Sequence, residues 1–217
     1  MEPLPAASRI LCINEVRIML KQLALASSLL LFALPPVTPA AMAAVEAPTY
    51  TADGSLVAPT HYREWVYLTS GIDMSYTATQ DTDHHMFDNT FVNPTSYREF
   101  LRTGTWPDKT TIVLEIRGAE SPVSINKRGH TQSTEIMGQE IHVKDNGKWL
   151  FYDLPTNATA AKVFEPTASC YTCHEAHAAV DTTFVQFYPT LLPIAKQKKT
   201  LSANYLKDEA AHAGPTK

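Results

Sequence analysis

The sequence predicts an α+β fold, a mainly antiparallel β-sheet with flanking helices. Residues 111–117 alternate as a strand does, with one apolar set facing one way: Ile112, Leu114 and Ile116. The extended runs 139–144 and 148–152 flank Asp145-Asn146-Gly147, and Asn-Gly between such runs is a strong hairpin signal. One helical pattern precedes these strands in the sequence and another follows them, so helices are expected before and after the sheet strands along the chain.

The elements before residue 111 are expected in the following order. Residues 61–66 predict a short helix that packs Trp65, and residues 87–92 predict a strand. Asn93-Pro94 then starts a helix, because proline suits the first helical turn. An apolar face and a glycine cap complete that helix: Tyr97, Phe100, Leu101 and Gly104. A turn follows at 106–109.

Beyond the hairpin, a helix is expected to start near Cys170 and run to Val180. Residues 182–188 look extended, and 189–199 predict a last helix interrupted by Pro193. From Ser202 on, a loosely held tail is expected.

The first 43 residues predict a secretory signal peptide. Lys21 precedes an apolar run at 23–34, two prolines follow, and Ala41-Met42-Ala43 forms a small-x-small cleavage site. A membrane anchor is the alternative, but this run is shorter than the roughly 20 residues that span a bilayer. Met19 is an alternative start. We therefore expect residues 44–217 to form one domain in the periplasm, with no membrane span after cleavage.

Composition excludes one class of partner. The chain carries a formal net charge of −4, and its basic residues form no stripe. Nucleic acid is therefore not expected as a partner.

Cys170-Tyr171-Thr172-Cys173-His174 is the motif that carries chemistry. Two thiols and a histidine at this spacing attach one c-type haem, with the thiols forming thioethers and the histidine binding iron. A zinc site needs about four ligands. Cys12 is lost with the leader, so only Cys170 and Cys173 remain, which argues against a zinc site. A thioredoxin-like pair does not need His174 and usually lies early in a βαβ pattern. Haem attachment is the favoured interpretation.

The ligand opposite His174 is not evident. No methionine follows the motif. Upstream candidates remain open: Met74, Met86, Met137, His84 and His85. His177 would lie on the same side of the ring as His174. A haem iron with a vacant position binds or transforms small molecules, whereas one with two strong ligands mainly passes electrons.

Five stretches of the chain resemble the cytochrome P-460 family, in the family's order and spacing. They are His61-Tyr62-Arg63-Glu64-Trp65, Phe91-Val92-Asn93-Pro94 with Tyr97, the segment 103–108, the hairpin 146–152, and the haem motif followed by Asp181 to Pro189. The resemblance implies a homodimer with a mainly antiparallel β fold and a five-coordinate haem. It also implies either binding of nitric oxide and carbon monoxide or oxidation of hydroxylamine. A periplasmic redox partner is a further candidate partner, which the sequence does not identify.

The resemblance also locates candidate pocket residues. Hydroxylamine-oxidising members join a lysine to the porphyrin at the position that is Leu114 here; Lys109, the nearest lysine, lies in the preceding turn. This difference favours the gas-binding branch. Glu165, five residues before Cys170, is the candidate proton acceptor of the alternative enzyme. Phe87 is the candidate aromatic cap over the distal iron face, with Leu114 beside it.

Overall fold

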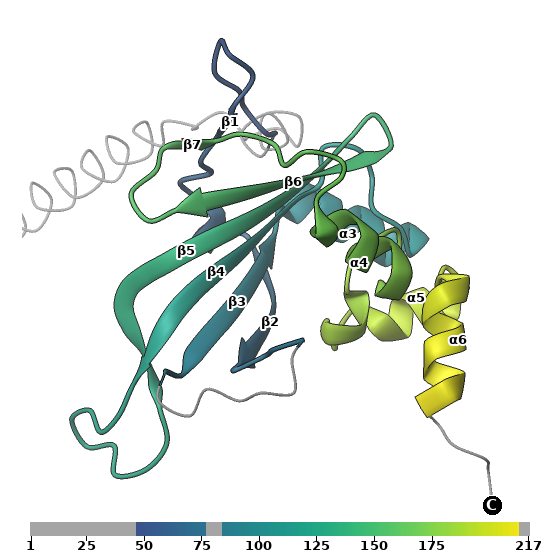
Figure 1. Cartoon of the computed structure of the whole chain (residues 1–217). Helices are drawn as coiled ribbons and strands as arrows, with labels where there is room; N and C mark the ends of the chain where they lie inside the picture. Colours follow the sequence, from purple (N-terminus) through teal and green to yellow (C-terminus); the bar gives the residue numbers. More distant parts are fainter. Residues whose placement is uncertain (1–46, 77–83, 213–217) are drawn as a thin grey trace, which may run out of the picture. The chain divides into compact units, whose positions relative to one another are not determined.

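The computed structural model describes residues 47–76 and 84–212. A five-stranded antiparallel sheet forms its centre, in the order β2-β3-β4-β5-β6 (Figure 1). The strands are β2 (Val66–Ile72), β3 (Met86–Val92), β4 (Thr111–Glu120), β5 (Thr131–Asp145) and β6 (Lys148–Pro155). A second sheet pairs β1 (Leu56–Val57) with β7 (Ala160–Ala161). The expected α+β class is confirmed.

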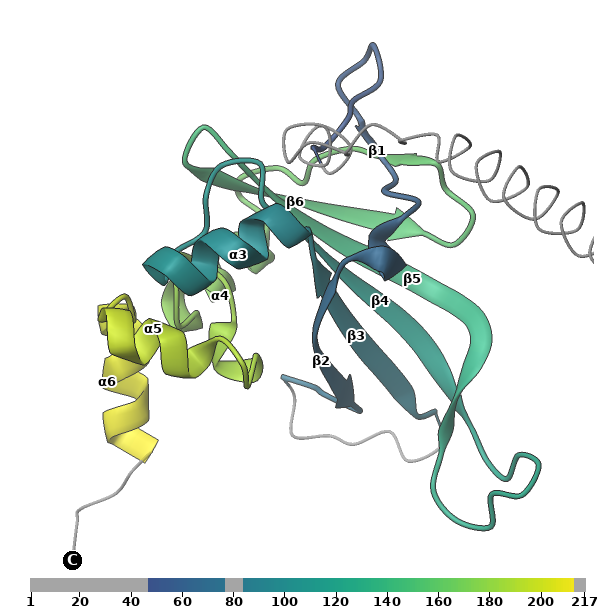
Figure 2. The same ribbon diagram turned by 180° about the vertical axis from the view of Figure 1, so that it is seen from behind.

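Among the described residues, four α-helices gather at one end of the sheet in both views (Figures 1 and 2). They are α3 (Pro94–Thr103), α4 (Ser169–His177), α5 (Leu192–Lys198) and α6 (Ala203–His212). Two short 3₁₀ helices of the same segments are η1 (Tyr62–Glu64) and η2 (Val185–Phe187). Within the described residues, none of these helices is long and apolar enough to cross a membrane. The signal-peptide prediction falls on residues outside those described.

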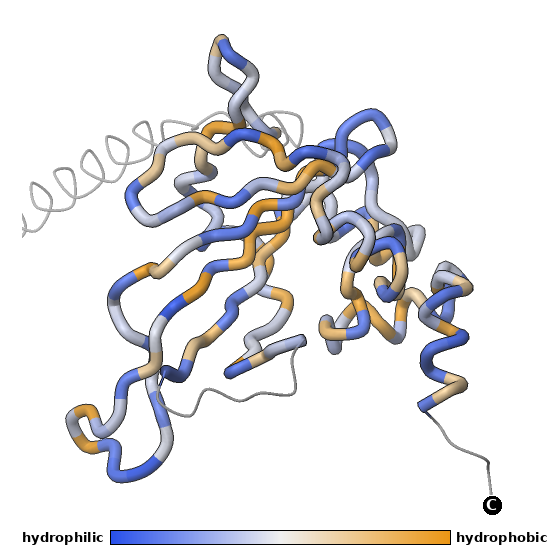
Figure 3. Tube along the Cα trace, viewed as in Figure 1, coloured by the Kyte–Doolittle hydropathy of each residue, from blue (hydrophilic) through white to orange (hydrophobic). Residues whose placement is uncertain are grey.

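Strand alternation gives the sheet two buried faces, as the pattern in β4 predicted. Ile112 belongs to the core beneath the helices, together with Phe100 and Trp106. Its neighbour Val113 belongs to a second core on the opposite face, with Tyr62 of η1. The apolar stretches of the central strands lie where these cores form (Figure 3).

The helix at α3 begins and ends where the sequence indicated. Gly104 has φ 78° and donates its backbone N–H to the carbonyl of Phe100, so it caps the helix in the left-handed conformation. The predicted apolar face is narrower than expected. Phe100 is buried, but Leu101 is 39% exposed, because it lies on the side of α3 that points away from the core.

The C-terminal third differs most from expectation. Residues 182–188 are not extended: Asp181 and Thr182 have positive φ, and η2 follows. Pro193 lies in the first turn of α5 and does not interrupt it. Residues 203–212 form a helix and not a loose tail, because Tyr205 is buried in the core and His177 of α4 bonds to Asp208. Strand β2 also went unpredicted.

Candidate functional site

Helix α4 places the haem-motif residues on one face. Cys170, Cys173 and His174 lie at i, i+3 and i+4, which are neighbouring positions on a helix surface. Both cysteines are partly buried free thiols. Cys170 packs against the core beneath the helices. The two sulfurs and the imidazole are therefore available to the same partner.

The ring of His174 has a fixed orientation and tautomer. Its Nδ1 lies 2.9 Å from the carbonyl oxygen of Thr182. A carbonyl only accepts hydrogen bonds, so Nδ1 carries the proton and the lone pair of Nε2 remains free for a ligand. Burial lowers the pKa of His174, although the Thr182 carbonyl acts in the opposite direction. Both effects together present a neutral, directed nitrogen donor.

Aromatic side chains surround the His174 ring. Its centroid lies 4.2 Å from that of Phe184 and 4.6 Å from that of Phe151. His142 of β5 meets it edge to face at 4.9 Å. Burial, and then the neighbouring His174, lower the pKa of His142 to about 3, so His142 is neutral at physiological pH. The two histidine rings are in contact and leave no room for a macrocycle between them.

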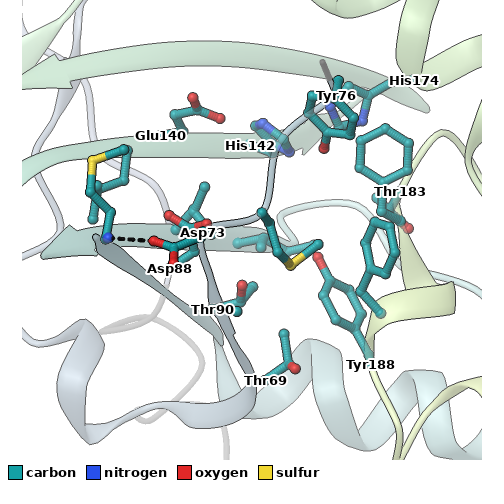
Figure 4. A pocket seen from close by; sticks show the side chains of 18 residues that line it. Thr69, Asp73, Tyr76, Asp88, Thr90, Glu140, His142, His174, Thr183 and Tyr188 are labelled. Carbon is teal, nitrogen blue, oxygen red and sulfur yellow. Dashed lines mark hydrogen bonds between the residues drawn. The ribbon is translucent and has the colours of Figure 1, made fainter. Parts of the chain in front are cut away.

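A cavity of about 320 Å³ lies between the sheet and the segment that carries His174 (Figure 4). β4 supplies an apolar row to its wall: Ile112, Leu114 and Ile116. Other strands supply polar groups, including Asp88 from β3 and Glu140 and His142 from β5. Phe184 and Tyr188, from the segment after His174, close the side opposite the sheet. The cavity thus combines an apolar centre with flanking carboxylates.

The pKa values of two of these carboxyl groups are raised. Burial, and then repulsion from Asp73, raise the pKa of Asp88. Burial, and then repulsion from Asp153 and Asp88, raise the pKa of Glu140. Glu140 still meets solvent through the cavity. A raised pKa makes a carboxylate a stronger base, which is the direction that a proton acceptor needs.

The structure brings only some of the predicted site residues together. Leu114 and His174 both line the cavity. Glu165 is exposed in the loop before α4, outside the residues that line it. Phe87 is half-buried and belongs to the strand positions that alternate with the cavity-lining Met86 and Asp88, so it lies on the other face of the sheet.

Sequence reasoning missed Glu140, His142 and Asp88. Strand register could have found the first, because Glu140 lies directly opposite Leu114 in the β4–β5 pair. Of the sixth-ligand candidates, Met74 and Met86 line the cavity, whereas Met137 does not.

One comparison with known proteins identifies the family of the chain. The family model described as cytochrome P-460 matches residues 59–185. The chain belongs to the cytochrome P-460 family. Membership makes it a haem-containing cytochrome. No curated protein matches this member of the family.

The residues on α4 fit the haem that the family implies. Two thiols and an imidazole whose Nε2 is unprotonated have the chemistry that attachment and ligation of a haem require.

Proposed function

We propose that this protein is a monohaem c-type cytochrome of the periplasm whose five-coordinate iron binds a small neutral ligand such as nitric oxide or carbon monoxide. Cys170 and Cys173 hold the haem, and His174 supplies the proximal nitrogen. When bound, the haem supplies an iron with one vacant coordination position, which accepts diatomic ligands. Export through cleavage of residues 1–43 and a homodimeric state are parts of the same proposal.

One observation carries the proposal: the His174 Nδ1–H is bonded to the Thr182 carbonyl, and Nε2 is left for a metal. The apolar row of β4 supports the choice of ligand. Leu114 presents hydrocarbon where the oxidising members of the family place a lysine, and its neighbours Ile112 and Ile116 extend that surface. Such a wall favours neutral, weakly hydrated ligands, because charged ones lose their hydration there.

The absorption spectrum of the ferrous protein, with and without carbon monoxide, tests the proposal. We expect a high-spin spectrum that converts fully to that of the low-spin carbon monoxide complex when carbon monoxide is added. A low-spin spectrum unchanged by carbon monoxide would instead indicate an electron carrier with a sixth ligand from the protein. Met74 and Met86 are then the first residues to substitute, because both line the cavity.

Oxidation of hydroxylamine is the second candidate, and Glu140 favours it. Its carboxylate lies in the cavity and has a raised pKa, so it can accept a proton from a bound N–H or O–H group. Glu165 is exposed and lies outside the cavity. If the protein turns over hydroxylamine with an artificial electron acceptor, Glu140→Gln should reduce kcat by about 10²-fold or more. Glu165→Gln is the matched control and should leave kcat unchanged.

A further inference from the structure

The loop that accepts the hydrogen bond of His174 has an unfavourable backbone. Asp181 and Thr182 are consecutive residues at φ 49° and 55°. Left-handed conformations are uncommon for residues other than glycine, and for a β-branched residue such as threonine they are outliers. Thr182 is the residue whose carbonyl oxygen meets His174 Nδ1. Surrounding contacts must therefore hold this carbonyl in place.

Two contacts hold the loop from the side of the sheet. Lys144, at the end of β5, pairs its ammonium group with the carboxylate of Asp181 and also donates to the carbonyl of Trp106 at 2.8 Å. The indole Nε1 of Trp106 donates to Thr183 Oγ1 at 2.8 Å. Thr183 in turn donates to the carbonyl of Val180 at 2.6 Å. Thr182 is thus flanked on both sides by residues tied to the sheet and the Trp106 turn.

Lys144 is a charged group with little access to water. Its side chain is 13% exposed, and that of Asp181 is 30% exposed. A nearby pair offers a contrast, since Lys109 also bonds to an aspartate, Asp145, but is 56% exposed. The two aspartates are similarly exposed, at 30% and 26%, so the pairs differ in the burial of the lysine. Breaking the Lys144 pair leaves an uncompensated charge with little access to water, whereas Lys109 returns to solvent.

We propose that the Lys144–Asp181 ion pair is a positioning device for the proximal ligand, and that it sets the donor strength of His174 by holding the Thr182 carbonyl on Nδ1–H. This inference rests on the proposed ligation of haem iron by His174. A hydrogen bond from the far nitrogen makes the imidazole a stronger donor and orients its ring. Releasing the loop weakens that bond. The iron–histidine bond then weakens, and the ferrous form becomes more favoured.

Two variants of the full holoprotein separate positioning from simple charge effects. Asp181→Asn removes the negative charge but keeps a residue that tolerates positive φ, so folding is preserved. Lys144→Met removes the positive charge and keeps the length of the side chain. Through charge alone, the two would move the midpoint potential in opposite directions, because a nearby positive charge favours the ferrous form. Through positioning, both raise it.

Resonance Raman spectra and redox titrations provide the readouts. In both variants we expect the iron–histidine stretching frequency to fall, and the ferrous-to-ferric ratio at a fixed ambient potential to rise about tenfold, equivalent to about 59 mV. Lys109→Met and Asp145→Asn should change neither quantity. Lys144→Arg should keep the wild-type iron–histidine frequency, because arginine retains the positive charge and N–H donors.

The outcomes distinguish this inference from the function on which it rests. No iron–histidine band in the wild-type ferrous protein would contradict the proposed five-coordinate iron with His174 as its ligand. A wild-type band with an unchanged frequency in both Asp181→Asn and Lys144→Met would overturn the positioning role alone. Potentials that move in opposite directions at constant frequency would likewise overturn it, since they would show a purely electrostatic effect.

Discussion

Glu115 is a buried carboxylate whose removal should strongly destabilise this fold. It follows Leu114 on β4 and points to the opposite face, where it is 2% exposed. Three donors reach its carboxylate: the Tyr62 hydroxyl and the guanidinium groups of Arg63 and Arg117. Glu115 therefore joins η1 to the centre of the sheet.

The magnitude follows from which donors are buried. The side chain of Arg63 is 48% exposed and can return to water, so its pair contributes at most about 1 kcal/mol. The side chain of Arg117 is 15% exposed, and Tyr62 is buried. Removing one partner of a buried charged pair costs about 3–5 kcal/mol. We expect Glu115→Ala to lower the free energy of unfolding by about 3 kcal/mol or more.

The pH dependence of stability has a definite sign. Burial opposes ionisation of Glu115, but the hydrogen bonds from Arg117 and Tyr62 and the charges of both arginines outweigh it, so its pKa lies below the ordinary value. Stability from such a group is present above its unfolded pKa of about 4.3 and is lost as pH falls through the lower folded pKa. Glu115→Ala should remove this acid-side loss.

Urea unfolding followed by circular dichroism, at pH 7 and at pH 3, measures both effects. Glu64→Ala is the matched control, because Glu64 lies on η1 with a side chain that is 80% exposed. A cost below about 1 kcal/mol for Glu115→Ala at pH 7 would refute this reasoning. So would an equal cost at both pH values.

Two further predictions concern attachment and the α3 cap. Replacing Cys170 and Cys173 with alanine should make the haem extractable with acid-acetone. Proteolysis of the wild type should yield porphyrin on a single peptide. A second peptide attached to the porphyrin would contradict the absence of a cross-link at Leu114. Gly104→Ala should destabilise more than Gly147→Ala, by about 1 kcal/mol or more in urea unfolding. Both glycines have positive φ, but a Cβ at Gly104 would lie 2.6 Å from Lys198 Cβ, whereas nothing lies within 4 Å at Gly147. Equal costs would show that the clash is relieved.

Local signals were sufficient for much of the fold. The alternation in β4 and the turn at Asn146-Gly147 depend on neighbouring residues, and the structure has both. The loop at Thr182 was missed, because its left-handed backbone is held by side chains distant in sequence such as Trp106. Helix α6 was missed although local signals were present: its residues are mostly strong helix formers, and the Ser202 hydroxyl accepts the backbone N–H of Tyr205 at its start. Burial of Tyr205 adds tertiary support.

The sequence predicted the haem-motif side of the candidate site but not the opposite wall of the cavity. The haem motif is contiguous, so its residues could be read directly. The opposite wall of the cavity depends on the register of β4 and β5, which places Leu114 opposite Glu140. That register depends on the length of the segment that connects the two strands, and no local sequence pattern fixes this length. Proximity to Cys170 in the sequence indicated Glu165, but proximity in the fold indicates Glu140.

The pairing of Leu114 with Glu140 bears on how the two proposed activities are related. Leu114 gives the pocket an apolar side chain on β4, and a carboxyl group with a raised pKa lies opposite it on β5. Binding of a neutral gas needs the apolar row of β4 and does not need Glu140. Oxidation of hydroxylamine needs a proton acceptor and therefore does. Carbon monoxide affinity should consequently survive Glu140→Gln, and any turnover should not, so one substitution separates the two functions.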